Sequence, residues 1–202
     1  MGFFSRWKTK RLLDKARKHA ENSRLADLSN AIFETAVARA NTIEPYLADI
    51  ADGKRQEVRL YCTFEFIYFF VHLTNRLALP MLGPQGRTRP MDELQPLLVF
   101  PAIEALFGDW PQDLKDKLAA DFVDKLQSSE TEYARCRPIT DSDFTAESNL
   151  FYTLARIVSD IAGKPDEVSL RSAIVADALQ GVQDVQWVAL VKEAAMEAGV
   201  RR

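Results

Sequence analysis

The sequence predicts an all-α protein, a single-domain bundle of six to eight helices around a central apolar helix at about residues 58–79. Apolar residues recur at steps of three and four along much of the 202-residue chain, as on the buried face of a helix. No stretch of useful length alternates between apolar and polar residues, as a half-buried strand does. With 47% hydrophobic residues, among them twelve phenylalanines, the chain has enough apolar material for a sizeable core.

The first segment, residues 1–21, is predicted to be a basic amphipathic helix or arm that precedes a bundle formed by residues 22–202. Residues 1–24 carry eight basic and two acidic side chains, a net charge of +6. Because the whole chain carries −3, the remaining residues carry −9. Three aromatic residues, Phe3, Phe4 and Trp7, stand at the front of this segment.

Three interpretations of this arm remain open. It is either an ordinary amphipathic helix docked on the body, a contact for a membrane surface or an acidic partner, or a nucleic-acid contact. The acidic remainder of the chain and its pI near 5.5 argue against nucleic acid. The candidate contact residues for a membrane or partner are Phe3, Phe4, Trp7, Lys8, Arg11 and Lys15.

A second helix is expected to follow the arm. Asn22 or Ser23 can cap it, because short polar side chains accept hydrogen bonds from the free N–H groups of a first turn. Pro45 is expected to open a short turn that ends at Gly53, a plausible C-cap. The apolar positions that predict the buried face are Leu25, Leu28, Ile32, Ala36, Ala40 and Ile43.

The central helix carries the most informative residues of the chain. It is apolar and aromatic almost throughout, yet it contains Glu65, His72 and Arg76. Steps of seven and eleven residues place these three side chains within about 40° of one another on a helix. Pro80 is expected to end this helix and to open a loop over residues 80–90, which contain three prolines and two glycines.

Prolines, glycines and capping residues mark the ends of the remaining predicted helices. Pro96 and Pro101 predict a short or kinked helix before Gly108. Asp109 and Pro111 open the next helix, whose predicted buried face is Leu114, Leu118, Phe122, Leu126 and Tyr133. A helix ending at Gly163 follows, with Asn149, Arg156 and Asp160 on its solvated side. Two more helices are expected at residues 165–180 and 183–198, separated by Gly181.

The stripe of Glu65, His72 and Arg76 has two interpretations. Buried ionisable groups are costly unless they are paired, so the stripe is either a structural network between helices or a ligand site. In the second case His72 beside a carboxylate is able to exchange a proton near neutral pH. Glu147 is expected to meet His72 or Arg76, and Arg87 and Arg89 are placed near the entrance of the site.

Several classes of function are excluded by missing motifs. There is no Gly-x-Ser-x-Gly nucleophile motif, and residues 83–86 lack the spacing and the lysine of a phosphate-binding loop. The chain has only two histidines, neither in the Glu-x-x-His motif of di-iron bundles, so no metal or cofactor is expected. Cys62 and Cys136 are expected to be free thiols.

A cytoplasmic protein is the expected outcome, peripheral at the membrane surface if the arm binds there. The first twenty residues lack the apolar core of a signal peptide, and charges interrupt the apolar run at residues 58–82. The sequence favours a non-enzymatic interaction or adaptor protein whose partner is a membrane surface, an acidic protein or a second copy of the chain. The alternative is a small-ligand-binding or catalytic bundle that uses Glu65, His72, Arg76 and Glu147.

Overall fold

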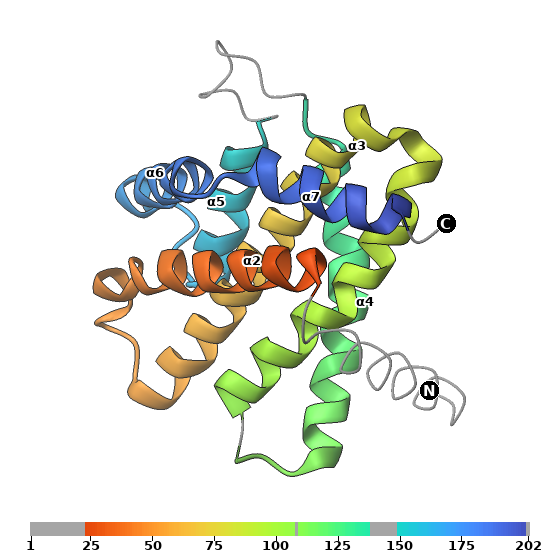
Figure 1. Ribbon diagram of the computed structural model, residues 1–202. Coiled ribbons are helices and arrows are strands. Elements are labelled where there is room, and N and C mark those ends of the chain that lie inside the picture. The colour runs from red at the N-terminus through yellow and green to blue at the C-terminus, as the bar shows by residue number, and fades with distance from the viewer. Residues whose placement is uncertain (1–22, 108, 138–148, 201–202) are drawn as a thin grey trace. The chain divides into compact units, whose positions relative to one another are not determined.

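The computed structural model describes residues 23–107, 109–137 and 149–200, except for the side chains of residues 89, 100, 101, 105–107 and 198–200. These residues form helices and no strand, so the prediction of an all-α protein is confirmed (Figure 1). The elements, labelled as in Figure 1, are α2 (Arg24–Asn41), the 3-10 helix η2 (Glu44–Leu47), α3 (Asp52–Phe107), α4 (Gln112–Ala134), α5 (Leu150–Ile161), α6 (Val168–Asp184) and α7 (Trp187–Val200).

Residue contacts divide the chain into two compact units, each assembled from segments that are distant in the sequence. Within the described residues, the first unit comprises 23–33, 73–127 and 187–200, and the second comprises 34–72, 128–137 and 149–186. Helices α2, α3 and α4 therefore contribute residues to both units. The predicted boundary between an arm and a bundle at residues 21 and 22 lies outside the described residues and stays a prediction.

Helix α2 follows its sequence pattern closely. The Ser23 hydroxyl accepts a hydrogen bond from the Ala26 N–H at 3.2 Å, so Ser23 is the N-cap. All six apolar positions that predicted the buried face, from Leu25 to Ile43, are buried. The period of three and four residues thus identified this face correctly.

The turn after α2 differs from the prediction at its end. Pro45 lies in the first turn of η2, where its missing N–H costs no hydrogen bond. Gly53 is not a C-cap, because it stands in the first turn of α3, directly after Asp52. An acidic residue at the start of a helix interacts favourably with the helix dipole, so Asp52 rather than Gly53 is the informative residue here.

The predicted loop at residues 80–90 is wrong. Helix α3 continues through Pro80 to Leu82, bends at Gly83, and resumes at Pro84. Gly83 has φ 68° and ψ 176°, a conformation that glycine adopts at low cost. Pro84 stands at the first position after the bend, where a proline is well tolerated. Beyond the bend, Arg87 donates a hydrogen bond to the Asn75 side chain at 2.8 Å.

Helix α4 buries most of the predicted face. Phe122, Leu126 and Tyr133 are buried and Leu118 is half-buried, but Leu114 is exposed. The neighbouring Lys115 is buried instead, and its ammonium group lies 3.2 Å from Glu104. A lysine is able to bury its aliphatic stem while the charged end reaches a carboxylate, and the apolar period does not detect this.

Helix α5 begins with an N-cap residue, Asn149, that the sequence analysis assigned to the solvated face of the helix. Asn149 was expected to be solvated, but it is buried and its side chain accepts a hydrogen bond from the Phe151 N–H at 2.8 Å. At the other end, Gly163 has φ 71°, and the N–H groups of Gly163 and Lys164 donate to the carbonyls of Asp160 and Ser159. This is a Schellman motif, and the predicted C-terminal glycine is confirmed.

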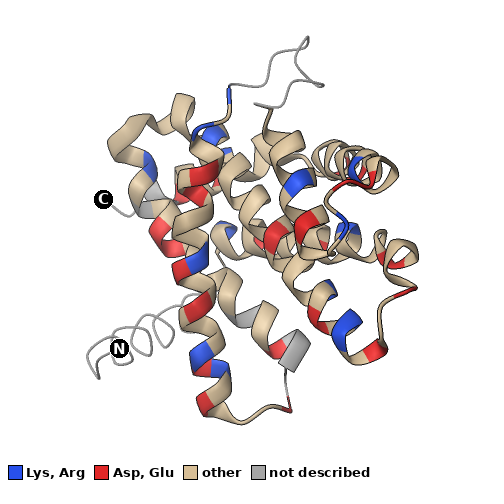
Figure 2. Ribbon diagram, turned by 180° about the vertical axis from the view of Figure 1, so that it is seen from behind, with Lys and Arg blue, Asp and Glu red and all other residues tan. Residues whose placement is uncertain are grey.

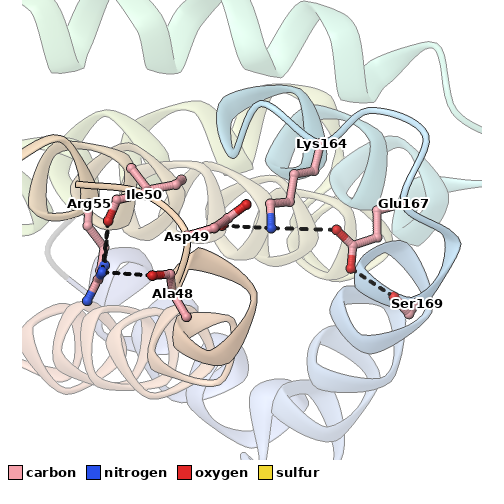
Figure 3. A network of polar contacts seen from close by, with 7 residues as sticks. All are labelled: Ala48, Asp49, Ile50, Arg55, Lys164, Glu167 and Ser169. Atoms are coloured by element: carbon pink, nitrogen blue, oxygen red, sulfur yellow. Dashed lines mark hydrogen bonds and ion pairs between the residues drawn. The ribbon is translucent and has the colours of Figure 1, made fainter. Parts of the chain in front are cut away.

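A polar network in the second unit holds the turn after η2 against the start of α6 (Figure 3). The Lys164 ammonium group donates to Asp49 at 2.9 Å and lies 3.8 Å from Glu167. The hydrogen bond raises the pKa of Lys164 and lowers the pKa of Asp49. The Arg55 guanidinium group donates to the carbonyls of Ala48 and Ile50, which closes the turn.

Helix α6 passes through Gly181 instead of ending there. A Cβ atom at this position would lie 2.7 Å from the Phe70 ring and 3.0 Å from Thr35 Cγ2. Gly181 is therefore the point at which α6 approaches α2 and α3 within the second unit, and the predicted separator is a packing residue.

We expect Gly181→Ala to destabilise the protein by about 1–3 kcal/mol, because overfilling a packed interior displaces its neighbours. Gly53→Ala is the matched control. Gly53 is helical and nothing lies within 4 Å of its would-be Cβ, so this variant should be neutral or slightly more stable. Urea unfolding monitored by circular dichroism measures both, and an equal effect of the two substitutions would contradict the packing role of Gly181.

Candidate functional site

Residues 62–74 of α3 form the most buried helix segment in the described chain. Every residue from Cys62 to Thr74 is buried, including Glu65 and His72, which belong to the second unit. An apolar helix surface of this kind was expected to lie in the interior. The partners of Glu65 and His72 come from the end of α4.

Glu65 is held by a tyrosine. The Tyr133 hydroxyl donates a hydrogen bond to Glu65 Oε1 at 2.7 Å, and both side chains are almost completely buried. Hydrogen bonds to a charged acceptor are roughly twice as strong as neutral ones, and this bond offsets part of the cost of burying a carboxylate.

His72 is held by Glu130, which lies about one turn before Tyr133 on α4. His72 Nδ1 and Glu130 Oε2 lie 3.0 Å apart and form a hydrogen bond. The His72 side chain is 4% exposed, whereas that of Glu130 is 24% exposed. Glu130 is therefore the more exposed member of this pair.

Aromatic rings surround both pairs. The His72 and Tyr133 rings are 5.6 Å apart, and the Phe69 ring meets Tyr133 edge-on at 6.1 Å. Phe69 also packs against Phe151 of α5 at 5.4 Å. Tyr133 thus links the two polar pairs, since it bonds to Glu65 and packs on His72.

Burial sets the protonation of the neighbouring groups. Burial, and then the charge of Glu65, raise the pKa of the Cys62 thiol to about 12. The same two causes raise the pKa of Tyr133 and of Tyr68 above that of an exposed phenol. Cys62 consequently stays a thiol at neutral pH rather than a nucleophilic thiolate, and Tyr133 stays a hydrogen-bond donor.

The other predicted site residues belong to the first unit or lie outside the described residues. Arg76 lies one turn beyond His72, is half-buried, and belongs to the first unit. Arg87 bonds to Asn75 in that same unit. The side chain of Arg89 is not described. Glu147 and the arm residues Phe3, Phe4, Trp7, Lys8, Arg11 and Lys15 lie outside the described residues, so their predicted roles stay predictions.

Sequence reasoning missed the partners of the stripe. Tyr133 was placed on the buried face of its helix, but its bond to Glu65 was not foreseen. Glu130 lies three residues before Tyr133, and residues at this spacing share one helix face. A carboxylate on the same face as a buried tyrosine was the signal that pointed to Glu130 as a partner of His72.

The described part of the chain was also compared with the requirements of a metal site, a ligand pocket and a membrane-spanning helix. It contains no group of three or more histidine, cysteine or acidic side chains placed to hold a metal ion. A small apolar pocket of about 10 Å³ lies in the first unit, lined by α2, α3 and α7, and has room for about one water molecule. None of the described helices combines the length and the apolarity needed to cross a bilayer.

Comparisons with known proteins give no further guidance, since the chain matches no protein-family model, no curated protein and no solved structure. The candidate site is therefore defined only by the geometry of the second unit. It consists of two hydrogen-bonded pairs, Glu65 with Tyr133 and His72 with Glu130, joined by the contact of the Tyr133 and His72 rings.

We expect Tyr133→Phe to lower the free energy of unfolding by about 2 kcal/mol, because a buried carboxylate loses a hydrogen-bond donor. Tyr152→Phe is the control, since its hydroxyl accepts a 3.2 Å bond from Arg171 at a partly buried position, and it should cost about 1 kcal/mol or less. In a Glu65→Gln background the loss from Tyr133→Phe should shrink. Urea denaturation of the four variants measures these differences, and an unchanged loss in the Gln background would refute the pairing.

Proposed function

We propose that the chain is a non-enzymatic interaction or adaptor protein whose basic N-terminal arm, residues 1–21, attaches a helical body to an anionic surface. The observation that carries the proposal is the charge separation in the sequence. Eight basic side chains lie within residues 1–24, while the rest of the chain carries a net charge of −9. An arm of opposite sign to its body is suited to a negatively charged partner.

The composition of the arm favours a membrane surface over an acidic protein. Phe3, Phe4 and Trp7 stand beside Lys8 and Arg11, and interfacial helices combine aromatic and basic side chains in this way. Each basic side chain near an anionic leaflet contributes about 1 kcal/mol of binding, and anionic lipids are concentrated on cytoplasmic leaflets. We therefore infer a cytoplasmic protein that is peripheral at the membrane.

The interior of the second unit supports a structural role for its polar residues. Glu65 and His72 each bond to a side chain of α4, and the aromatic contacts of Tyr133 fill the space beside them. Cys62 remains a protonated thiol because of its raised pKa. Groups that satisfy one another in this way fix the register of two helices without any chemistry on a substrate.

Exposed apolar side chains on the first unit are available to a protein partner or a second copy. Val188 and Met196 on α7 are more than half exposed, and Trp110 and Leu114 are nearly half exposed at the start of α4. Single exposed apolar residues are common on protein surfaces, so they support the adaptor role only in combination with the arm.

The second candidate function is ligand binding or catalysis at the buried cluster. The observation that favours it is the His72–Glu130 pair, since a histidine beside a carboxylate is a frequent acid/base arrangement. Native mass spectrometry of the purified chain separates the two functions. We expect the bare chain mass for the adaptor, whereas an additional mass that is lost on mild denaturation, and absent from a His72→Gln variant, would favour the ligand site.

We expect deletion of residues 1–20 to abolish binding to vesicles of phosphatidylserine and phosphatidylcholine while the circular dichroism of the body persists. Replacing Lys8, Arg11 and Lys15 together by Gln should weaken binding by about 3 kcal/mol, at about 1 kcal/mol for each charge. Vesicle sedimentation measures both effects.

The matched control replaces three exposed lysines of the body, Lys54, Lys117 and Lys192, by Gln and should leave binding nearly unchanged. Equal losses in the two triple variants would mean that the arm has no special role. Binding to acidic proteins without binding to vesicles would replace the membrane by an acidic partner.

A further inference from the structure

We propose that the bend of α3 at Gly83 is a second membrane-contact site, at which exposed apolar side chains enter the interface of an anionic bilayer. This inference rests on the proposed function, because it adds a contact on the body to the contact made by the arm. The site, which we name the bend site, consists of residues 77–87 and lies entirely within the first unit. Figure 1 shows the bend in yellow, where α3 changes direction.

The last turn of α3 before the bend is exposed over much of its circumference. Leu79, Pro80 and Met81 are three consecutive exposed residues, and the side chains of Leu79 and Met81 are 38% and 39% exposed. At about 100° per residue, these three positions span about 200° of the helix. The preceding Ala78 is buried, so this turn contacts the rest of the unit through its other side. The bend site is therefore a convex apolar surface and not a groove.

The charge of this segment is complementary to an anionic surface. Between Glu65 and Asp92 the sequence contains three arginines and no acidic residue, although the chain after residue 24 carries a net charge of −9. The Arg87 guanidinium group donates to the neutral side chain of Asn75 at 2.8 Å, so this contact leaves the positive charge uncompensated. Figure 2 shows a tan arch at the bend, without the red of acidic residues.

Another pair of exposed apolar residues in the same unit stands among charges of the opposite sign. Trp110 and Leu114 at the start of α4 are 47% and 42% exposed. They are accompanied by three exposed aspartates, Asp109, Asp113 and Asp116. An anionic leaflet repels carboxylates, so this pair is unsuited to a bilayer surface. The combination of exposed apolar side chains with basic charge distinguishes the bend site and is typical of interfacial membrane contacts.

The backbone at the bend contributes few hydrogen-bond donors that would be left without water. The first N–H groups of a helix have no partner inside it, and removing such groups from water is costly. Pro84, the first residue after the bend, has no N–H, and its carbonyl accepts a hydrogen bond from the Thr88 hydroxyl at 3.2 Å. Pro80 also lacks an N–H. These features lower the cost of placing the bend at the depth of about 5–10 Å that interfacial contacts reach.

Site-specific fluorescence of the full-length protein tests this contact. A Met81→Cys variant is labelled with an environment-sensitive nitrobenzoxadiazole group, which reacts selectively there because Cys62 and Cys136 are buried. We expect vesicles of phosphatidylserine and phosphatidylcholine to shift its emission to shorter wavelength. The same label on a Lys117→Cys variant is the control and should not shift, since Lys117 is exposed on α4, outside the bend site. Vesicle binding without a shift at residue 81 would overturn the proposal.

Two double variants measure how much the bend site contributes to vesicle binding. Leu79→Gln with Met81→Gln should weaken binding about tenfold, because two side chains that are each about two-fifths exposed no longer bury that apolar area in the interface. Leu114→Gln with Val188→Gln is the matched control, since both residues are exposed in the same unit, and its binding should be nearly unchanged. Circular dichroism checks that both variants are folded, and equal losses of binding would overturn the proposal.

The outcomes separate this inference from the proposed function. Vesicle binding that requires residues 1–20, but gives no shift at residue 81, would leave the proposed function intact and refute the bend site. A shift at residue 81 that persists after deletion of residues 1–20 would support the bend site and remove the arm from the proposed function. An absence of vesicle binding by the full-length protein would refute both.

Discussion

The constraint on which the second unit depends is the burial of two ionisable side chains on an apolar helix. Glu65 and His72 are two turns apart on α3, and their partners Tyr133 and Glu130 are nearly one turn apart on α4. The residue nearer the start of α3 pairs with the residue nearer the end of α4, so the two segments run antiparallel. Sliding one helix along the other would strand a buried carboxylate or imidazole at a cost of several kcal/mol.

Apolar packing alone would define this register less sharply. The segment from Cys62 to Thr74 is apolar on nearly all sides, and hydrophobic contacts are non-directional. The two polar pairs remove this ambiguity because hydrogen bonds require specific distances and angles. Tyr133 has two roles here, since its hydroxyl reaches Glu65 and its ring packs on His72 and Phe69.

Local patterns in the sequence predicted those features that depend on a few neighbouring residues. The buried face of α2, the Ser23 cap and the C-terminal glycine at Gly163 follow from apolar period, side-chain length and backbone freedom. The predictions failed where the meaning of a residue depends on distant contacts. Gly181 was interpreted as a helix end, although its small size serves the approach of Phe70 and Thr35.

Prolines led to the other large error. The run of prolines after residue 79 predicted a loop, but a proline disrupts a helix mainly through one lost hydrogen bond and one clash, and both are avoided just after a bend. Gly83 concentrates the backbone change in one residue and allows helix on both sides. For the candidate site, the sequence identified Glu65 and His72 but not their partners, because pairing between α3 and α4 depends on tertiary packing.

The proposed contact of the arm with an anionic surface has an electrostatic and a hydrophobic component. Salt weakens the electrostatic component, since it acts between exposed charges. The aromatic residues Phe3, Phe4 and Trp7 contribute a hydrophobic term wherever a surface buries their rings. A bilayer interface is able to bury those rings, and each buried aromatic ring contributes about 1.5–3 kcal/mol. A membrane therefore adds a hydrophobic term to the attraction between charges, whereas an acidic surface without an apolar region offers the attraction between charges alone.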